Sequence, residues 1–294
     1  MPKFSLERVQ HVTDGFWRFL GGNVPDVVIV LGSGLSGVTG MVQNASTASY
    51  RSLRLEVPKA EGHEGVAYFG HVGEKSVLVL SGRVHCYEGV NIHTIVASLR
   101  ALVRIGVKNF ILTSAVGSLS RLYEPGKVVL VGNHISLFME RDDNPLMGRW
   151  LHESGLGPRL RFTSMEGAYH GKAFNFVSSG ISGDVEFFPW LIAPRQGLTL
   201  AFARGPQYET AAEAELLAKL GAHVVGMSVV PEVMAIQHMA LGISDVEQRP
   251  SVSALSFITN YSGAGSNSHE EVMDAGPLGA ARLTEVLHRV ITQL

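Results

Sequence analysis

Short, continuous runs of apolar residues recur along the chain, and most of them are bounded by glycine or polar residues. Runs of this kind are typical of buried strands. They occupy residues 27–31, 66–69, 77–80, 110–112, 128–131, 198–203, 224–225 and 252–258. Amphipathic segments separate several of these runs, and strands that alternate with helices predict an α/β fold.

Two helices are indicated by capping residues around an apolar face. Asn91 can cap a helix that Gly106 ends, because asparagine is a favoured N-cap and glycine a favoured C-cap. Thr210 and Glu213 form a capping box ahead of a second helix, which Gly221 ends.

Two further helices are predicted in the C-terminal part of the chain. Pro231 suits the first turn of a helix, since its missing N–H group would be unpaired there anyway. Ser268 and Glu271 form another capping box. Pro277 predicts that this last helix is kinked or restarts, with its main part over residues 278–294.

The alternation of elements predicts a single domain over residues 1–294, with a mixed, largely parallel central sheet flanked by helices. No Pro/Ser-rich linker, internal repeat or charged tail divides the sequence. Residues 141–198 are weakly periodic, and few elements can be predicted there.

Composition excludes several classes of protein. The 294 residues include 24 Lys+Arg and 26 Asp+Glu, a formal net charge of −2, and 46% are hydrophobic. Such a chain is too apolar for disorder, and its charge argues against nucleic acid or anionic membrane as a partner. One cysteine, Cys86, can form no internal disulfide. With no signal-peptide core and no membrane-spanning apolar run, a cytoplasmic location is expected.

Glycine-rich segments follow several of the predicted strands, at the sheet edge where such folds bind ligands. Residues 32–37 read Gly-Ser-Gly-Leu-Ser-Gly and match the dinucleotide fingerprint. That fingerprint needs a helix next, and residues 41–50, rich in Asn, Ala, Ser and Thr, indicate none. The loop also suits an anion held by backbone N–H and hydroxyl groups, or is a plain tight turn.

Residues 82–89 follow another strand and combine groups that bind anions. Arg83 and His85 alternate, so they face the same way on an extended segment, and Tyr87 joins them. Arginine forks onto phosphate oxygens, and histidine adds a donor that can carry charge. The alternative is a surface loop with ordinary charges.

Three more positions follow strands and have both a ligand role and a structural one. Glu209 can bind a ligand or complement the dipole of the following helix. Ser228, before a helix, is a cap or a donor to an anion. Asn260 ends a strand and can pair with a flat heterocycle or form an Asx-turn. No metal-site spacing occurs, because His63 and His269 lack a second histidine four residues on.

Six segments in order, from residue 25 to the C-terminus, resemble the trimeric purine nucleoside phosphorylase family. They are residues 31–35, 82–89, 205–210, 226–232, 258–260 and 269–272. The resemblance implies phosphorolysis: inorganic phosphate attacks C1′ of a purine (deoxy)ribonucleoside and releases the base and (deoxy)ribose 1-phosphate. It also implies a homotrimer and a role in purine salvage.

The resemblance assigns roles to residues of this chain. Phosphate would be held by Ser33, His63, Arg83, His85, the Ala115 amide and Ser228. The ribose would be contacted by Tyr87, Met227, His269 and Phe162, the last from a neighbouring subunit. The purine would be held by Tyr208, Glu209, Thr259 and Asn260.

The implied chemistry needs neither metal nor cofactor, since phosphate is a co-substrate. The leaving purine gathers negative charge, which Asn260 near N7 and Glu209 on N1–H would stabilise, while phosphate, with His85 beside it, supports the oxocarbenium-like sugar. Asn260, Glu209 and His85 are therefore the expected catalytic residues.

Two alternatives remain beside a phosphorylase for 6-oxopurine nucleosides. The related methylthioadenosine phosphorylases act on a 6-aminopurine, but they resemble this chain less because they carry Asp where Asn260 stands. The other alternative is an NAD-binding α/β protein. The chain departs from the family pattern at Ser114, Ser118, Asn133, Leu200 and Arg204, which bears on base range more than on reaction type.

Overall fold

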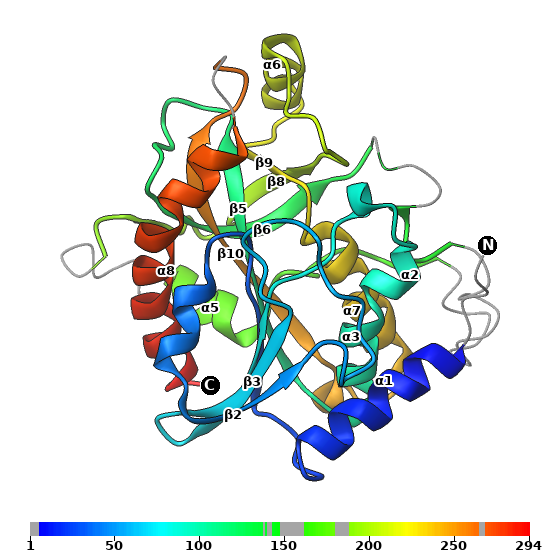
Figure 1. Ribbon diagram of the computed structural model, residues 1–294. Helices are drawn as coiled ribbons and strands as arrows, with labels where there is room; N and C mark the ends of the chain where they lie inside the picture. Colours follow the sequence, from blue (N-terminus) through cyan, green and yellow to red (C-terminus); the bar gives the residue numbers. More distant parts are fainter. Residues whose placement is uncertain (1–5, 138, 140–142, 148–161, 180–187, 265–267) are drawn as a thin grey trace.

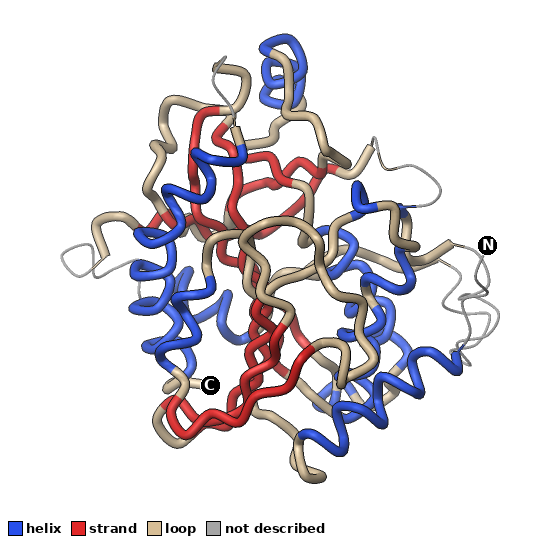
Figure 2. The backbone as a smooth tube through the Cα atoms, in the orientation of Figure 1, coloured by secondary structure: helices blue, strands red, loops and turns tan. Residues whose placement is uncertain are grey.

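The structure of the protein is a computed structural model that describes residues 6–137, 139, 143–147, 162–179, 188–264 and 268–294. Within these residues, strands join into one continuous sheet, with helices on both of its faces (Figures 1 and 2). The strands are β1 (Val27–Val30), β2 (Gln43–Ser49), β3 (Val66–Val72), β4 (Lys75–Ser81), β5 (Asn109–Ser118), β6 (Val128–Ile135), β7 (Leu191–Ile192), β8 (Leu198–Phe202), β9 (Val224–Gly226) and β10 (Ser251–Tyr261).

Five strands close on themselves into a barrel. The order around it is β10, β6, β8, β9 and β5, and β10 also pairs with β5. From β5 the sheet continues through β1, β4 and β3 to β2. Among the described strands, six pairings are parallel and four are antiparallel. The predicted mixed, largely parallel sheet is confirmed, and its closure is an addition to that prediction.

Helices bury apolar faces against two sides of the sheet. The α-helices are α1 (Leu6–Phe19), α2 (Ile92–Ile95), α3 (Ala97–Ile105), α5 (Lys172–Ser179), α6 (Ala211–Lys219), α7 (Val230–Gly242) and α8 (His269–Ile291). Helices α1, α3 and α7 share one core, and α5 and α8 form the other (Figure 1). Helix α6 projects beyond the end of the sheet and packs on a small third cluster.

Two helix predictions need correction. The helix predicted after Asn91 is broken at Val96 (φ −87°, ψ 4°), which ends α2 and precedes α3. The last helix does not restart after Pro277, because α8 runs through it from His269 to Ile291. A proline inside a helix costs about 3 kcal/mol, and burial of the α8 face along most of its length offsets that cost.

Four elements were not predicted, for different reasons. Helix α1 has buried Val9, Val12 and Phe16 on one face, so its amphipathic pattern is present in the sequence and was overlooked. Strand β2 is an exposed, polar edge strand and therefore has no apolar run. Helix α5 and the two-residue β7 lie in the weakly periodic region.

The dinucleotide alternative lacks its structural context. After β1 the chain makes a 3₁₀ turn over Ser36–Met41 and enters β2, which pairs antiparallel with β3 at the edge of the sheet. A dinucleotide fingerprint instead requires an α-helix and a following parallel strand. No helix among the described residues is long and apolar enough to cross a membrane.

A buried cluster of basic side chains lies between α3 and α7. Arg100 is fully buried, and its Nη1 lies 3.2 Å from Nδ1 of His93, while Nη2 donates to the Pro145 carbonyl at 2.6 Å. His238 Nδ1 lies 2.7 Å from the Thr163 hydroxyl. Burial, reinforced by the charge of Arg100, lowers the pKa of both His93 and His238 to about 4. Both imidazoles are therefore neutral at pH 7.

We expect the protein to lose stability as pH falls from 6.5 to about 4. Each imidazole is protonated below 6.5 when unfolded but remains neutral in the folded protein down to about 4. Unfolding therefore takes up protons in this window, and acid favours it. Thermal unfolding against pH measures the slope. His238→Gln should flatten it, whereas the exposed control His288→Gln should not, and equal slopes for all three proteins would contradict the prediction.

Candidate active site

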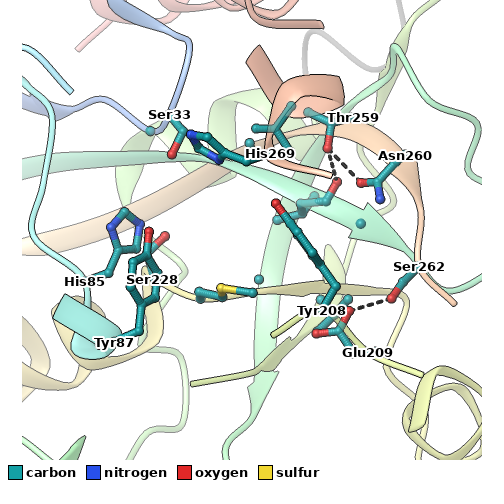
Figure 3. Close-up of a pocket in the computed structure, with 18 residues that line it drawn as sticks. Ser33, His85, Tyr87, Tyr208, Glu209, Ser228, Thr259, Asn260, Ser262 and His269 are labelled. Carbon is teal, nitrogen blue, oxygen red and sulfur yellow. Dashed lines mark hydrogen bonds between the residues drawn. The ribbon is translucent and has the colours of Figure 1, made fainter. Parts of the chain in front are cut away.

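A pocket opens at the carboxyl ends of β1, β5, β9 and β10, where the sequence predicted a ligand site (Figure 3). Residues from all six of the segments noted above line it. The lining consists of Gly32, Ser33, His85, Tyr87, Ala115, Val116, Gly117, Tyr208, Glu209, Val225, Gly226, Met227, Ser228, Thr259, Asn260, Ser262, His269 and Val272. Segments far apart in the sequence therefore meet at one edge of the sheet.

Close backbone approaches shape this pocket. A Cβ atom at Gly32 would lie 2.7 Å from the Ser114 Cα, so only glycine lets the loop after β1 cross β5 there. A Cβ atom at Gly276 would lie 2.6 Å from the Gly34 carbonyl oxygen. The missing side chain allows α8 to lie directly on the glycine loop and brings His269 to the pocket.

A bulge in β10 aims two side chains at one end of the pocket. The register with β5 shifts between Ile258 and Asn260, so Thr259 is the extra residue. The Thr259 hydroxyl donates to Asn260 Oδ1 at 2.9 Å and lies 3.3 Å from the Val116 carbonyl (Figure 3). Because Oδ1 faces Thr259, the amide nitrogen of Asn260 is turned away from it.

The same end of the pocket holds a carboxylate. Ser262 donates from its hydroxyl to Glu209 Oε2 at 2.6 Å (Figure 3). The cap of α6 is formed by Thr210, which accepts from the Glu213 amide at 3.2 Å, so Glu209 is not needed as the cap. One oxygen of Glu209 is thus fixed by Ser262, and Tyr208 stands beside it.

The other end of the pocket holds two serine hydroxyls that each face a positioning group. His63 Nδ1 accepts the Arg83 amide at 3.3 Å, so Nε2 carries the proton and donates to Ser33 Oγ at 3.0 Å. Burial, with the charges of His85 and Arg83, lowers the pKa of His63 to about 3 and keeps it neutral. Ser228 Oγ accepts from Arg83 Nη1 at 3.3 Å. Both serines therefore retain their own protons for donation.

Arg83 lies behind this end of the pocket. Its Nε donates to Glu232 Oε1 at 2.9 Å, Nη1 to the Thr113 carbonyl at 2.5 Å, and Nη2 to the Val30 carbonyl at 3.4 Å. Neither Arg83 nor His63 is among the residues that line the pocket. Both stand one layer back and contact the serines.

His85 lines the pocket and is held by its neighbours. Its ring stacks on Tyr87 with centroids 4.9 Å apart, and its Nδ1 lies 3.5 Å from Glu88 Oε1. Burial alone would raise the pKa of Glu88, but hydrogen bonds from His85 and from the Lys59 amide lower that pKa to about 2. Glu88 is thus a carboxylate that orients His85.

Ser228 is presented by a strained turn. Val229 has φ 67° and ψ −53°, and the Val230 amide donates to the Ser228 carbonyl at 2.7 Å, which forms a γ-turn. A β-branched residue in this region costs on the order of 1–3 kcal/mol. The turn connects the end of β9 to the start of α7 within three residues, which places Ser228 just before the N-terminus of the helix.

Tyr87, Met227 and His269 also line the pocket. Within the described residues, the buried Nε2 of His269 has no hydrogen-bond partner. Phe162 is 88% exposed and does not line the pocket of its own chain. Its assignment to a neighbouring subunit's pocket stays a prediction.

Three residues of functional interest were not singled out from the sequence. Ser262 follows the strand that carries Asn260, and the Gly/Ser composition of that segment gives no sign that it meets Glu209. Glu88 and Glu232 lie inside predicted motifs, three and four residues after His85 and Ser228 respectively. The positions of Glu88 and Glu232 within these motifs can be read from the sequence, but the residues that they contact are known only from the structure.

The departures from the family pattern have defined places. Ser114 Oγ lies 2.8 Å from Ser256 Oγ in the buried β5–β10 pair, and Leu200 is part of the core. Arg204 Nε pairs with the buried Asp143 at 3.1 Å. Among the described residues, no group of three or more histidine, cysteine, aspartate or glutamate side chains could hold a metal ion.

Comparison with known proteins identifies the family of the chain. A family model described as the phosphorylase superfamily matches residues 26–292. Purine nucleoside phosphorylase of Rattus norvegicus is 32% identical over 272 residues, which cover 89% of this chain and 86% of the rat protein. Purine nucleoside phosphorylase 1 of Geobacillus stearothermophilus is 32% identical over 224 residues, or 75% and 77% of the two chains.

Solved structures show the same fold. Isoform 2 of purine nucleoside phosphorylase from Schistosoma mansoni, in complex with cytosine and ribose-1-phosphate, has a TM-score of 0.83 at 28% identity, with 99% and 97% of the chains covered. The Schistosoma mansoni enzyme in complex with inosine has a TM-score of 0.82 at 27% identity, with the same coverage. The chain therefore belongs to the phosphorylase superfamily, as an enzyme of the purine nucleoside phosphorylase type.

Proposed function

We propose that the enzyme cleaves 6-oxopurine (deoxy)ribonucleosides, such as inosine and guanosine, with inorganic phosphate and no other cofactor. The observation that carries this proposal is that Asn260 and Glu209 both lie at one end of the pocket. Thr259 holds the amide oxygen of Asn260, and Ser262 holds one oxygen of Glu209. The site therefore offers a donor and an acceptor in fixed orientations.

A 6-oxopurine complements these two groups. Its N7 and O6 atoms accept hydrogen bonds, as the Asn260 amide nitrogen requires, and its N1–H group donates to Glu209. An adenine ring has an acceptor at N1, which would face the carboxylate unfavourably. As the bond between C1′ and N9 breaks, charge on the purine strengthens the bond to Asn260, so this contact favours the transition state.

Phosphate would bind at the opposite end of the pocket. The hydroxyls of Ser33 and Ser228 can both donate, since His63 and Arg83 supply the hydrogen bonds that these oxygens accept. His85 and the Ala115 amide complete the proposed set. Arg83 contributes positive charge from behind Ser228. The bound dianion then attacks C1′ from the side opposite the purine.

The sugar would lie between these ends, against Tyr87 and Met227. Nε2 of His269, which has no partner among the described residues, suits the 5′-hydroxyl of a nucleoside, a group that a 5′-methylthio substrate lacks. We also propose a homotrimer in which the exposed Phe162 reaches the sugar side of a neighbouring pocket.

The proposal is tested by initial rates with inosine, adenosine and 5′-methylthioadenosine, each with and without phosphate. We expect a phosphate-dependent rate for inosine, with kcat/KM at least about tenfold above that for the two 6-aminopurines. Higher kcat/KM for 5′-methylthioadenosine would favour the alternative substrate class. Turnover of inosine without phosphate, to free ribose, would contradict phosphorolysis.

A further inference from the structure

Glu232 is a buried carboxylate directly behind the proposed phosphate site. It lies in the first turn of α7, four residues after Ser228. Its Oε1 accepts from Nε of Arg83 at 2.9 Å, and the two side chains are only 7% and 4% exposed. Arg83 in turn donates to Ser228 Oγ. Arg83 therefore connects the Glu232 carboxylate to Ser228, one of the proposed phosphate ligands.

Glu232 also lines a second cavity. Its Oε2 is buried and has no hydrogen-bond partner in the described part of the chain. The cavity has a volume of about 30 Å³ and is lined also by Arg83, Thr94 and Ser98. This volume accommodates one or two waters at most. Among the described residues, Arg83 is the charged group that pairs with this carboxylate.

We propose that Glu232 is the resident counter-ion of Arg83: it neutralises this buried arginine when phosphate is not bound and thereby limits how tightly phosphate binds. The inference rests on the proposed phosphate site. Glu232 does not contact phosphate itself, because Arg83 stands between them, so it acts as a positioning residue.

Two opposing effects follow from this geometry. A buried arginine without a counter-ion is costly, so the carboxylate stabilises the folded protein without phosphate. The same negative charge repels a phosphate dianion one side chain away, in a region of low dielectric. Loss of the charge should therefore lower stability and raise phosphate affinity together. A purely structural residue would not tighten binding when replaced.

Glu232→Gln separates charge from geometry, because the amide oxygen can still accept from Arg83 Nε. We expect its Kd for inorganic phosphate, by calorimetry, to fall at least about tenfold. Its melting temperature should be lower without phosphate, and phosphate should raise that temperature more than in the wild type. The KM for phosphate in inosine phosphorolysis should fall in parallel. An unchanged or higher Kd would overturn the proposal.

Further variants distinguish the possible failures. Ser253→Ala removes a buried hydroxyl that accepts the Phe174 amide, away from the pocket, and should change stability but not the phosphate Kd. Should Glu232→Gln not fold alone, the Kd is measured on Glu232→Asp. This variant keeps the charge but retracts it from Arg83, and its Kd should not fall; a tenfold fall would overturn the counter-ion role.

A wild type that binds no phosphate would instead refute the proposed function.

Discussion

Glu209→Ala should lower kcat/KM for inosine by about 10²- to 10³-fold, the loss expected when a group that stabilises the transition state is removed. Glu209 lines the pocket, and Ser262 fixes its Oε2 at 2.6 Å. In the proposed function, the other carboxylate oxygen accepts N1–H of the departing purine. Truncation removes this acceptor and also leaves the Ser262 hydroxyl without its partner.

The matched control is Glu213→Ala, four residues on. Glu213 completes the capping box of α6 with Thr210 and does not line the pocket. Its loss should lower stability, because the cap is weakened, and should leave kcat/KM within about threefold. If Glu209→Ala folds and also stays within threefold of wild type, Glu209 is not the base anchor.

Asn260→Asp should shift selectivity from inosine toward adenosine by about 10- to 100-fold in the ratio of kcat/KM values, since a mispaired buried polar group costs about 1–3 kcal/mol. Thr259 would still donate to one oxygen of the new carboxylate. The second oxygen would then replace an amide donor. A carboxylate cannot donate to O6, but it can accept from the 6-amino group of adenine.

Asn91→Asp provides the same chemical change outside the pocket. Asn91 is exposed, and its Oδ1 accepts the His93 amide at 3.0 Å, which aspartate can also do. This variant should leave the inosine to adenosine ratio unchanged. A wild-type enzyme that already prefers adenosine would show that the interpretation of Asn260 is wrong.

The elements that the sequence predicted well are those in which local chemistry and tertiary position agree. The continuous run at residues 27–31 forms β1 because both faces of that strand are covered. Asn91 and Thr210 cap the helices they were expected to cap. The polar strand β2 was missed because its place at the sheet edge removes the need for apolar residues.

The sequence indicated where the site lies in the fold, but it did not predict the contacts between the residues of the site. Glycines and polar residues after strands indicated the correct edge of the sheet, because parallel strands share that edge. The β10 bulge at Thr259 depends on pairing with a distant strand, so no local pattern reveals it. The same holds for the contact of Ser262 with Glu209 and for the second-layer position of Arg83 beside Glu232.

The pairing of β5 with β10, which closes the barrel, has a consequence for how the chain folds during its synthesis on the ribosome. Ser114 and Ser256, in contact across this pairing, are 142 residues apart in the sequence. Contacts between such distant segments form slowly, because the intervening chain must first lose its freedom. The pocket also needs α8, which follows the other described helices in the sequence. A ligand of the pocket can therefore stabilise the chain only after α8 has been synthesised, and until then the chain depends on its own core.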